Sequence, residues 1–542
     1  MQELFENLKN IFKKDISILW IFSAVLGLAL VALDLRNKLP LRAGDFAFIS
    51  ILILCVAMYR PRWVFYIFIS LVPLENIILA SGYLPLQLRP YQFVGAVLAI
   101  AISILWAARH LNFKLLKPAW LDWLVFSLVP LSFLPLITAQ AKSAIIKNNL
   151  ILFSFVVLYF LVRNFVRTKR HLLETVFFTL AGNLVVLAYG FGQVFADKFG
   201  RNSFEVFFGR PNAAFTEPDW LGIYLCFMLA ILLSILYFLC HPAHSRKFLE
   251  KITNVVAYVL VFLDLTLLIL TLSRSAWVGA AGLIFFFLIF SLYEKKNSGP
   301  VFTPKKFAKN FAAMVAIIVL SLAAVHFGRL SKFDIFDRAR STATSEQKIT
   351  IACDNDENIP EYITDTSELS SYNCLHINLE DIKSFQSRGK YVTEIFRKDP
   401  NVATRSEIYQ KSFEILKKNP LFGIGFGTIS QTLGTDSRGS GLNESNIFLQ
   451  VWAGTGVLGL TFFTVLLAYL AIFSLRRLSP ACPLNHFIGC PVARGEFEQF
   501  LNVFLFLGLV GLILPNLFNA GLFMGIWWIG LGILTSVSKI QN

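Results

Sequence analysis

Apolar segments constrain the fold of this chain more than any other feature of its sequence. About fourteen segments are apolar enough to be candidate membrane spans, which need ~20 residues each as α-helices. Only 15% of the residues are charged, whereas soluble proteins have roughly 25%. We therefore predict an all-α polytopic membrane protein with about 12–14 transmembrane helices. The segments lie near residues 17–33, 46–59, 63–80, 91–108, 121–137, 148–166, 172–196, 220–240, 253–272, 275–293, 308–327, 446–474, 496–514 and 516–537.

Lysine and arginine are concentrated in alternate loops between these segments. Loops rich in these residues usually stay in the cytoplasm, so both termini are expected there. The other loops then face outward. We accordingly predict an N-terminal bundle of about eleven helices (1–327), a large extracytoplasmic loop (328–445) and C-terminal spans (446–542). The cytoplasmic set includes Lys13, Lys14, Arg60, Arg62, Arg163, Arg167, Lys295, Lys296, Arg476 and Arg477.

The polar step Ser273-Arg274-Ser275 fixes an arginine at one membrane face. The apolar runs Val255–Leu272 and Ala276–Leu292 flank it and leave almost no loop. A charge in this place is costly and usually functional, and a guanidinium engages phosphate oxygens bidentately. The formal net charge of +15 therefore indicates cytoplasmic anchoring and a site for an anionic ligand, rather than nucleic-acid binding.

Three further outward arginines lie near the ends of apolar or amphipathic segments. Arg89 opens a span, Arg210 lies in a Gly-Arg-Pro-Asn segment, and Arg405 falls in the first turn of a predicted helix. Phosphate binding explains why arginines persist on the outward side. The alternatives are snorkelling to lipid phosphates or pairing with local acids, such as Glu217 or Asp219, and Arg405 could be a solvated face residue or pair with Glu407.

The large loop has a polar part and a better patterned part. Residues 342–400 are typical of a variable insertion, and Cys353 and Cys374 within it are predicted to form a structural disulfide outside the cytoplasm. Residues 403–418 have the apolar spacing of a short amphipathic helix. The glycine-rich turn 421–427 permits positive φ angles and close backbone approach to a ligand. No His or Cys array has metal-binding spacing, so no metal is expected.

The segment Glu444-Ser445-Asn446 leads the chain back into the membrane. Ser445 and Asn446 can cap the following helix, or they can position an attacking hydroxyl. Glu444 is the only carboxylate of this segment. Partial burial would raise its pKa towards the range of a general base.

Four segments in this order resemble the O-antigen ligase/O-antigen polymerase superfamily. They are Gly209 to Asp219, Thr271 to Trp277, Arg405 through Asn419-Pro420 to Gly425, and Gly454 to Leu460. The resemblance is sharpest over about residues 205–295 and 403–465.

The resemblance implies an inverting, metal-independent glycosyltransferase of the GT-C type that needs no cofactor. The donor would be a polyprenyl-diphosphate-linked glycan, such as one on undecaprenyl diphosphate, on the outer face of the bacterial cytoplasmic membrane. A glycan, lipid or protein would be the acceptor. Arg210, Arg274 and Arg405 would bind the donor diphosphate and stabilise it as a leaving group. Arg89, Ser445 and Asn446 are further candidate substrate contacts.

This chain departs from the superfamily pattern at one position. Ligases of the lipopolysaccharide type commonly carry His-Asn near the start of the span after the large loop, and here the pair is Ser445-Asn446. Because of this departure, the protein could function as a polymerase or as a ligase that uses another acceptor. Glu444 is our candidate for the missing base, and the other possibility is that the acceptor needs little base assistance.

Two other classes of membrane protein fit the number of spans. A transporter or flippase for a lipid-linked glycan or another anion would suit the arginines, although the two halves show no repeat. An ion-translocating subunit would need ionisable residues inside spans, for which Glu75, Glu174 and Asp264 are the candidates. We interpret Asp264 as a helix-packing hydrogen-bond partner.

Overall fold

The structure is a computed structural model, and it confirms a polytopic all-α fold. Among the residues it describes, eleven helices are long and apolar enough to cross a membrane, and three shorter apolar helices accompany them. The described residues are 14–80, 87–139, 141–239, 248–296, 299–333, 335–338, 346–356, 359–377, 381–398, 400–434, 441–478 and 496–540.

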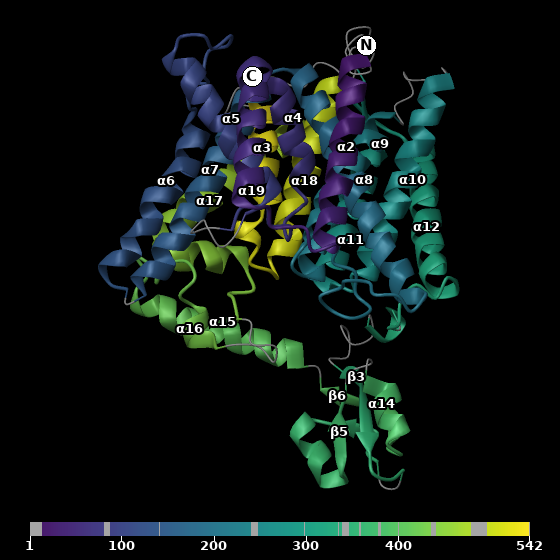
Figure 1. Cartoon of the computed structure of the whole chain (residues 1–542). Coiled ribbons are helices and arrows are strands. Elements are labelled where there is room, and N and C mark those ends of the chain that lie inside the picture. The colour runs from purple at the N-terminus through teal and green to yellow at the C-terminus, as the bar shows by residue number, and fades with distance from the viewer. Residues whose placement is uncertain are drawn as a thin grey trace.

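The helices run alternately up and down through one bundle. Both termini lie at one end of it and the large loop lies at the other, which we call the loop end (Figure 1). The bundle helices are α2 (Lys14–Leu35), α3 (Ala43–Tyr59), α4 (Pro61–Leu71), α5 (Pro90–Ala107), α6 (Trp120–Phe133), α7 (Lys142–Phe165), α8 (Lys169–Lys198), α9 (Pro218–Leu239), α10 (Phe248–Leu270), α11 (Arg274–Leu292), α12 (Pro304–Phe327), α17 (Ile447–Leu478), α18 (Glu496–Asn516) and α19 (Gly525–Ile540). The short η1 (Leu134–Ile137) and η5 (Gly521–Phe523) and the hairpin β1 (Tyr293–Lys296) and β2 (Gly299–Phe302) complete it.

Among the eleven described helices that are long enough to span a membrane, α9 is the most buried, and it packs against α10, α11 and α18. Glycines allow close approach there, because a Cβ on Gly279 would lie 2.8 Å from the sulfur of Cys226. Such small residues let membrane helices pack backbone to backbone. This rigid centre fixes the position of the α10–α11 step.

Each of the three carboxylates considered for ion translocation has a partner in the bundle. Asp264 accepts a hydrogen bond from Asn183 at 3.3 Å, which confirms its helix-packing role, and Glu174 pairs with Arg170 at 2.8 Å. The remaining ion-translocation candidate, Glu75, pairs with Arg89. Two of the three carboxylates are thus neutralised by arginine, which favours a structural role for them over a path for ions.

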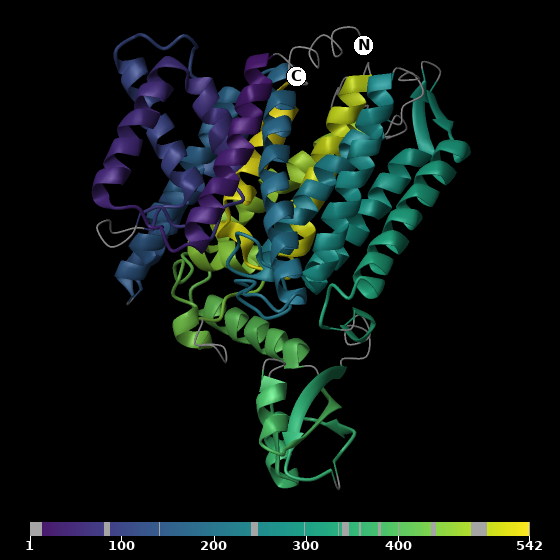
Figure 2. The same cartoon turned by 45° about the vertical axis from the view of Figure 1, so that its right-hand side comes forward.

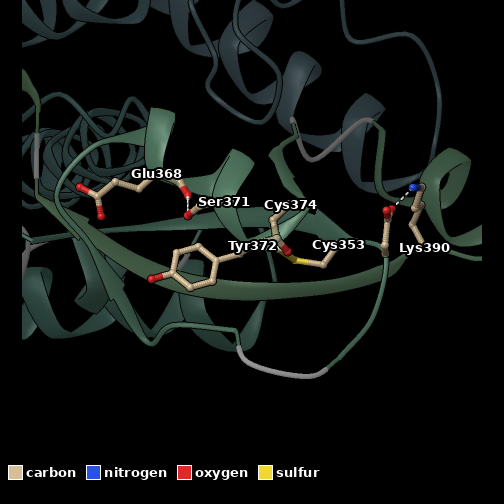
Figure 3. Close-up of a disulfide and its surroundings, with 7 residues drawn as sticks. Cys353, Glu368, Ser371, Tyr372, Cys374 and Lys390 are labelled. Atoms are coloured by element: carbon tan, nitrogen blue, oxygen red, sulfur yellow. Dashed lines mark hydrogen bonds and ion pairs between the residues drawn. A yellow bond between two sulfur atoms is a disulfide. The ribbon is translucent and has the colours of Figure 1, made fainter.

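Residues 346–398 form a small sheet, where the sequence indicated only a variable insertion. Its strands have the order β4-β6-β3-β5, and β3 is antiparallel to both neighbours. The disulfide Cys353–Cys374 closes β3 onto β5 (Figure 3). The elements are β3 (Glu346–Cys353), β4 (Tyr362–Ile363), η2 (Thr366–Tyr372), β5 (Cys374–His376), α14 (Ile382–Ser387) and β6 (Tyr391–Lys398).

The amphipathic helix of the large loop is α15 (Pro400–Lys418), and the short α16 (Ser430–Leu433) follows it. Figure 2 shows α15, in green, lying across the loop end between the bundle and the small sheet. Its buried face carries Ile408 and Leu416, as its apolar spacing predicts.

The glycine-rich turn after α15 docks on a break in α17. Ile424 and Gly425 both donate their backbone N–H groups to the carbonyl of Ala453 at 2.9 Å. Gly456 has a φ of +69° inside α17, and a Cβ there would lie 1.9 Å from the Leu421 carbonyl oxygen. The glycines therefore allow a close approach between the loop and the helix.

Candidate functional site

The α10–α11 step holds Arg274 in a tight turn at the loop end. α10 ends at Leu270, and Leu272 adopts a φ of +55° that reverses the chain. The backbone N–H of Ser273 donates to the hydroxyl of Thr271 at 3.2 Å. Arg274 is then the first residue of α11 and is half-buried. A helix N-terminus adds partial positive charge to that of the guanidinium, so this point favours an anion.

Arg210 reaches the same step from the loop between α8 and α9. Its Nε donates to the carbonyl oxygen of Thr271 at 2.9 Å, and its guanidinium lies 5.7 Å from the ring centre of Phe207. Its Nη2 also lies 3.5 Å from Asp219, so the pairing given as an alternative is present as a long contact. The side chain keeps 17% of its exposure. The structure thus brings Arg210 and the Arg274 step together.

A buried amide pair makes the Arg210 loop rigid. The side-chain oxygen of Gln193 accepts the backbone N–H groups of Asn212 and Ala213 at 3.1 and 2.7 Å. The side-chain nitrogen of Asn212 donates to the carbonyl of Phe215 at 2.6 Å, and only 2% of Asn212 is exposed. The Pro-Asn part of the superfamily motif is therefore a structural support for Arg210.

The connection between α18 and α19 links other parts of the candidate site. Asn519 donates to the hydroxyl of Ser275, next to Arg274, at 2.8 Å. Asn446 donates to the carbonyl of Leu517, in the same connection, at 2.8 Å. The sequence did not reveal this connection, because the two predicted spans on either side of it, 496–514 and 516–537, are separated by a single residue. The only available signal was the polar pair Asn516 and Asn519 in that apolar region.

Arg89 lies at the loop end but is engaged by a buried carboxylate. Its Nη1 pairs with Glu75 and donates to the Tyr91 hydroxyl at 3.1 Å and the Phe523 carbonyl at 3.4 Å. Glu75 is 5% exposed and also accepts the backbone N–H of Gly525 at 2.5 Å. These contacts tie α5 to the α18–α19 connection. They give Arg89 a structural role, which is the pairing with an acidic residue that the sequence left as an alternative.

The segment before α17 combines a helix cap with a buried acid. Asn446 caps α17, because its side-chain oxygen accepts the N–H groups of Phe448 and Leu449 at 2.8 and 3.2 Å, which confirms the capping alternative. Ser445 has a φ of +48° and turns the chain into the helix. Only 4% of Glu444 is exposed, and burial raises the pKa of its carboxyl to about 7.

Arg405 belongs to the same end through α15. It lies one turn before Tyr409, whose hydroxyl donates to the carbonyl of Ser445 at 3.1 Å. Glu407, its alternative partner, pairs with Lys411 at 2.6 Å. A continuous set of contacts therefore runs from the helix of Arg405 through residues 445–446 and 517–519 to the step of Arg274.

Residues 259–464 match the family model described as O-antigen ligase. The match supports the resemblance to the O-antigen ligase/O-antigen polymerase superfamily. The matched residues are rather more than a third of the chain, and they contain Arg274, Arg405 and Glu444, whereas Arg89 and Arg210 precede them. No curated protein matches the chain. The chain thus has eleven candidate membrane spans among its described residues and a long segment similar to the O-antigen ligase family, which supports glycan transfer of the ligase type in general.

Proposed function

We propose that this protein transfers a glycan from a polyprenyl diphosphate to an acceptor hydroxyl on the outer face of the bacterial cytoplasmic membrane. The loop end would face outward and both termini would face the cytoplasm, as the loop charges indicate. The reaction would need no metal, because fixed arginines would stabilise the charge on the departing diphosphate.

The observation that carries this proposal is the contact between Arg210 and the Arg274 step. The guanidinium of Arg210 binds the carbonyl of Thr271, three residues before Arg274 at the N-terminus of α11. Two guanidinium groups and a helix N-terminus in one place suit a doubly charged diphosphate. Arg405 approaches this end on α15 and would add a third cation.

The chemical step would be a direct displacement at the anomeric carbon. The acceptor oxygen would form the new bond on the face opposite the diphosphate, and the bond from that carbon to the diphosphate oxygen would break, which inverts the configuration. Glu444 would take the hydroxyl proton, since a buried carboxylate with a pKa of about 7 is suited to general-base catalysis. Polyprenyl diphosphate would leave, held by the arginines.

The test is transfer by purified protein in liposomes supplied with a polyprenyl-diphosphate oligosaccharide. Arg274→Ala and Arg274→Lys should each lower transfer about 100-fold or more, because neither keeps the bidentate guanidinium. Arg388→Ala is the matched control, since Arg388 is exposed on the small sheet domain and its loss should leave transfer unchanged.

Four outcomes decide the proposal. A longer lipid-linked chain would identify a polymerase, and a glycan on a new acceptor would identify a ligase. A glycan that crosses the bilayer without a new bond would instead support a flippase. Full transfer by Arg274→Ala would refute the role of the α10–α11 step.

A further inference from the structure

We propose that a polar pocket beside the Arg210 loop binds one uncharged sugar ring of the substrate glycan. This inference rests on the proposed function, which places a glycan at the loop end. The pocket has a volume of about 240 Å³ and lies between the last turn of α2, α8 and the loops before α5 and α9. The residues that carry its chemistry are Asp34, Asn37, Asn76, Tyr189, Phe204 and Asn212.

The lining of this pocket suits sugar hydroxyls. The carboxylate of Asp34 accepts hydrogen bonds, the amides of Asn37 and Asn76 both donate and accept them, and Tyr189 adds a hydroxyl. The ring of Phe204 offers an apolar face to the C–H groups of a sugar. The lining is thus mainly polar, which suits a ligand that carries several hydroxyl groups.

The charge of the lining argues against phosphate and against a metal ion. None of the described residues that line the pocket is Lys or Arg, and Asp34 would repel an acidic group. One carboxylate is also few for a divalent cation, since Ca²⁺ takes about six to eight oxygen ligands. An uncharged sugar ring is the ligand class that remains.

The pocket is held open by hydrogen bonds that leave its polar groups in place. The backbone N–H of Asn76 donates to the carbonyl of Ala214 at 2.8 Å and so joins the two loops that form its walls. The side-chain oxygen of Asn212 accepts a hydrogen bond from the side-chain nitrogen of Gln193 in α8 at 3.2 Å, and its side-chain nitrogen donates to the carbonyl of Phe215. Because the pocket is already formed, binding does not have to include the entropy cost of ordering its walls.

The position and size of the pocket relate it to the proposed reaction. Asn212 lies two residues after Arg210 in the same rigid loop, so the pocket and the diphosphate site can hold neighbouring parts of one substrate. Its volume of about 240 Å³ is below the ~300–1,000 Å³ of pockets for drug-sized ligands. It therefore suits a single ring rather than an oligosaccharide.

The experiment measures binding to the purified full chain in detergent with two probes. One probe is the oligosaccharide released by mild acid from the cell's own polyprenyl-linked glycan, and the other is inorganic diphosphate. The variants are Asp34→Asn and Tyr189→Phe in the pocket and Arg274→Ala at the step. Asp45→Asn is the matched control, because Asp45 is exposed at the same end of the bundle and does not line the pocket.

Asp34→Asn should weaken oligosaccharide binding about tenfold or more, since it removes a charge-assisted hydrogen bond. Asp34→Asn and Asp45→Asn should leave diphosphate binding unchanged. Arg274→Ala should weaken diphosphate binding and leave oligosaccharide binding unchanged. The proposed sugar site would be refuted if the wild type bound no oligosaccharide, or if Asp34→Asn and Tyr189→Phe bound it as tightly as the wild type does. Diphosphate binding that survives Arg274→Ala would instead refute the proposed function and leave the pocket standing.

Discussion

Replacement of Glu444 by glutamine should remove the pH dependence of glycan transfer in the neutral range. The carboxyl is 4% exposed, and burial raises its pKa from an ordinary 4.5 to about 7. If Glu444 is the base, the transfer rate of the wild type should rise with pH and level off above about 7. Glu444→Gln cannot accept a proton, so its rate should be low and flat across the same range.

The same pKa predicts a change in stability whose sign can be worked out. Between pH 4.5 and 7 the folded chain keeps the proton on Glu444 while the unfolded chain has lost it, so stability falls as pH rises through this window. Above pH 7 the raised pKa lowers the free energy of unfolding by about 3 kcal/mol. Glu444→Gln does not ionise, so it should gain stability relative to the wild type as pH rises from 5 to 8.

Two measurements check this pair of expectations. The first is transfer in liposomes between pH 5.5 and 8.5, and the second is thermal unfolding of the purified protein over the same range. Glu407→Gln serves as the control, because Glu407 is exposed on α15 and its loss should move neither profile. A Glu444→Gln enzyme with a normal rate and an unchanged inflection near pH 7 would refute the assignment of the base.

Two further substitutions test packing at the loop end. Gly456→Ala should prevent stable folding, because its Cβ would lie 1.9 Å from the Leu421 carbonyl oxygen at a φ of +69°; a cost above about 4 kcal/mol is expected. Gly44→Ala is the control and should not change stability, because open space surrounds Gly44. Equal expression and equal unfolding temperatures of the Gly456→Ala and Gly44→Ala variants would contradict the prediction. Arg89→Gln should destabilise the protein by about 3–5 kcal/mol in thermal unfolding, because it strands the buried carboxylate of Glu75. Adding Glu75→Gln should recover most of that loss, and no recovery would show that the charge is not the cause.

The spans could be predicted because each is a local property of the sequence. The predicted segments 17–33 and 308–327 correspond to α2 and α12, whose helices extend only a few residues further. The predicted segment 63–80 was wrong at its end, because α4 stops at Leu71. Beyond it the chain turns, so that the carboxylate of Glu75 reaches its partner.

The candidate site could be predicted only where adjacent residues define it. The position of Arg274 follows from two apolar runs that leave no loop between them. The contact of Asn519 with Ser275 joins residues 244 positions apart, and no local pattern indicates such a contact. The small sheet was missed for a related reason, because its strands β4 and β5 have two and three residues and gain their order from β3 and β6.

The small sheet domain begins and ends at one point. Glu346, the first residue of β3, lies directly opposite Lys398, the last residue of β6, and paired antiparallel strands place such residues about 5 Å apart. The chain therefore enters the small sheet and leaves it at almost the same place. A unit attached in this way can grow, shrink or be exchanged for another during evolution without displacing α15.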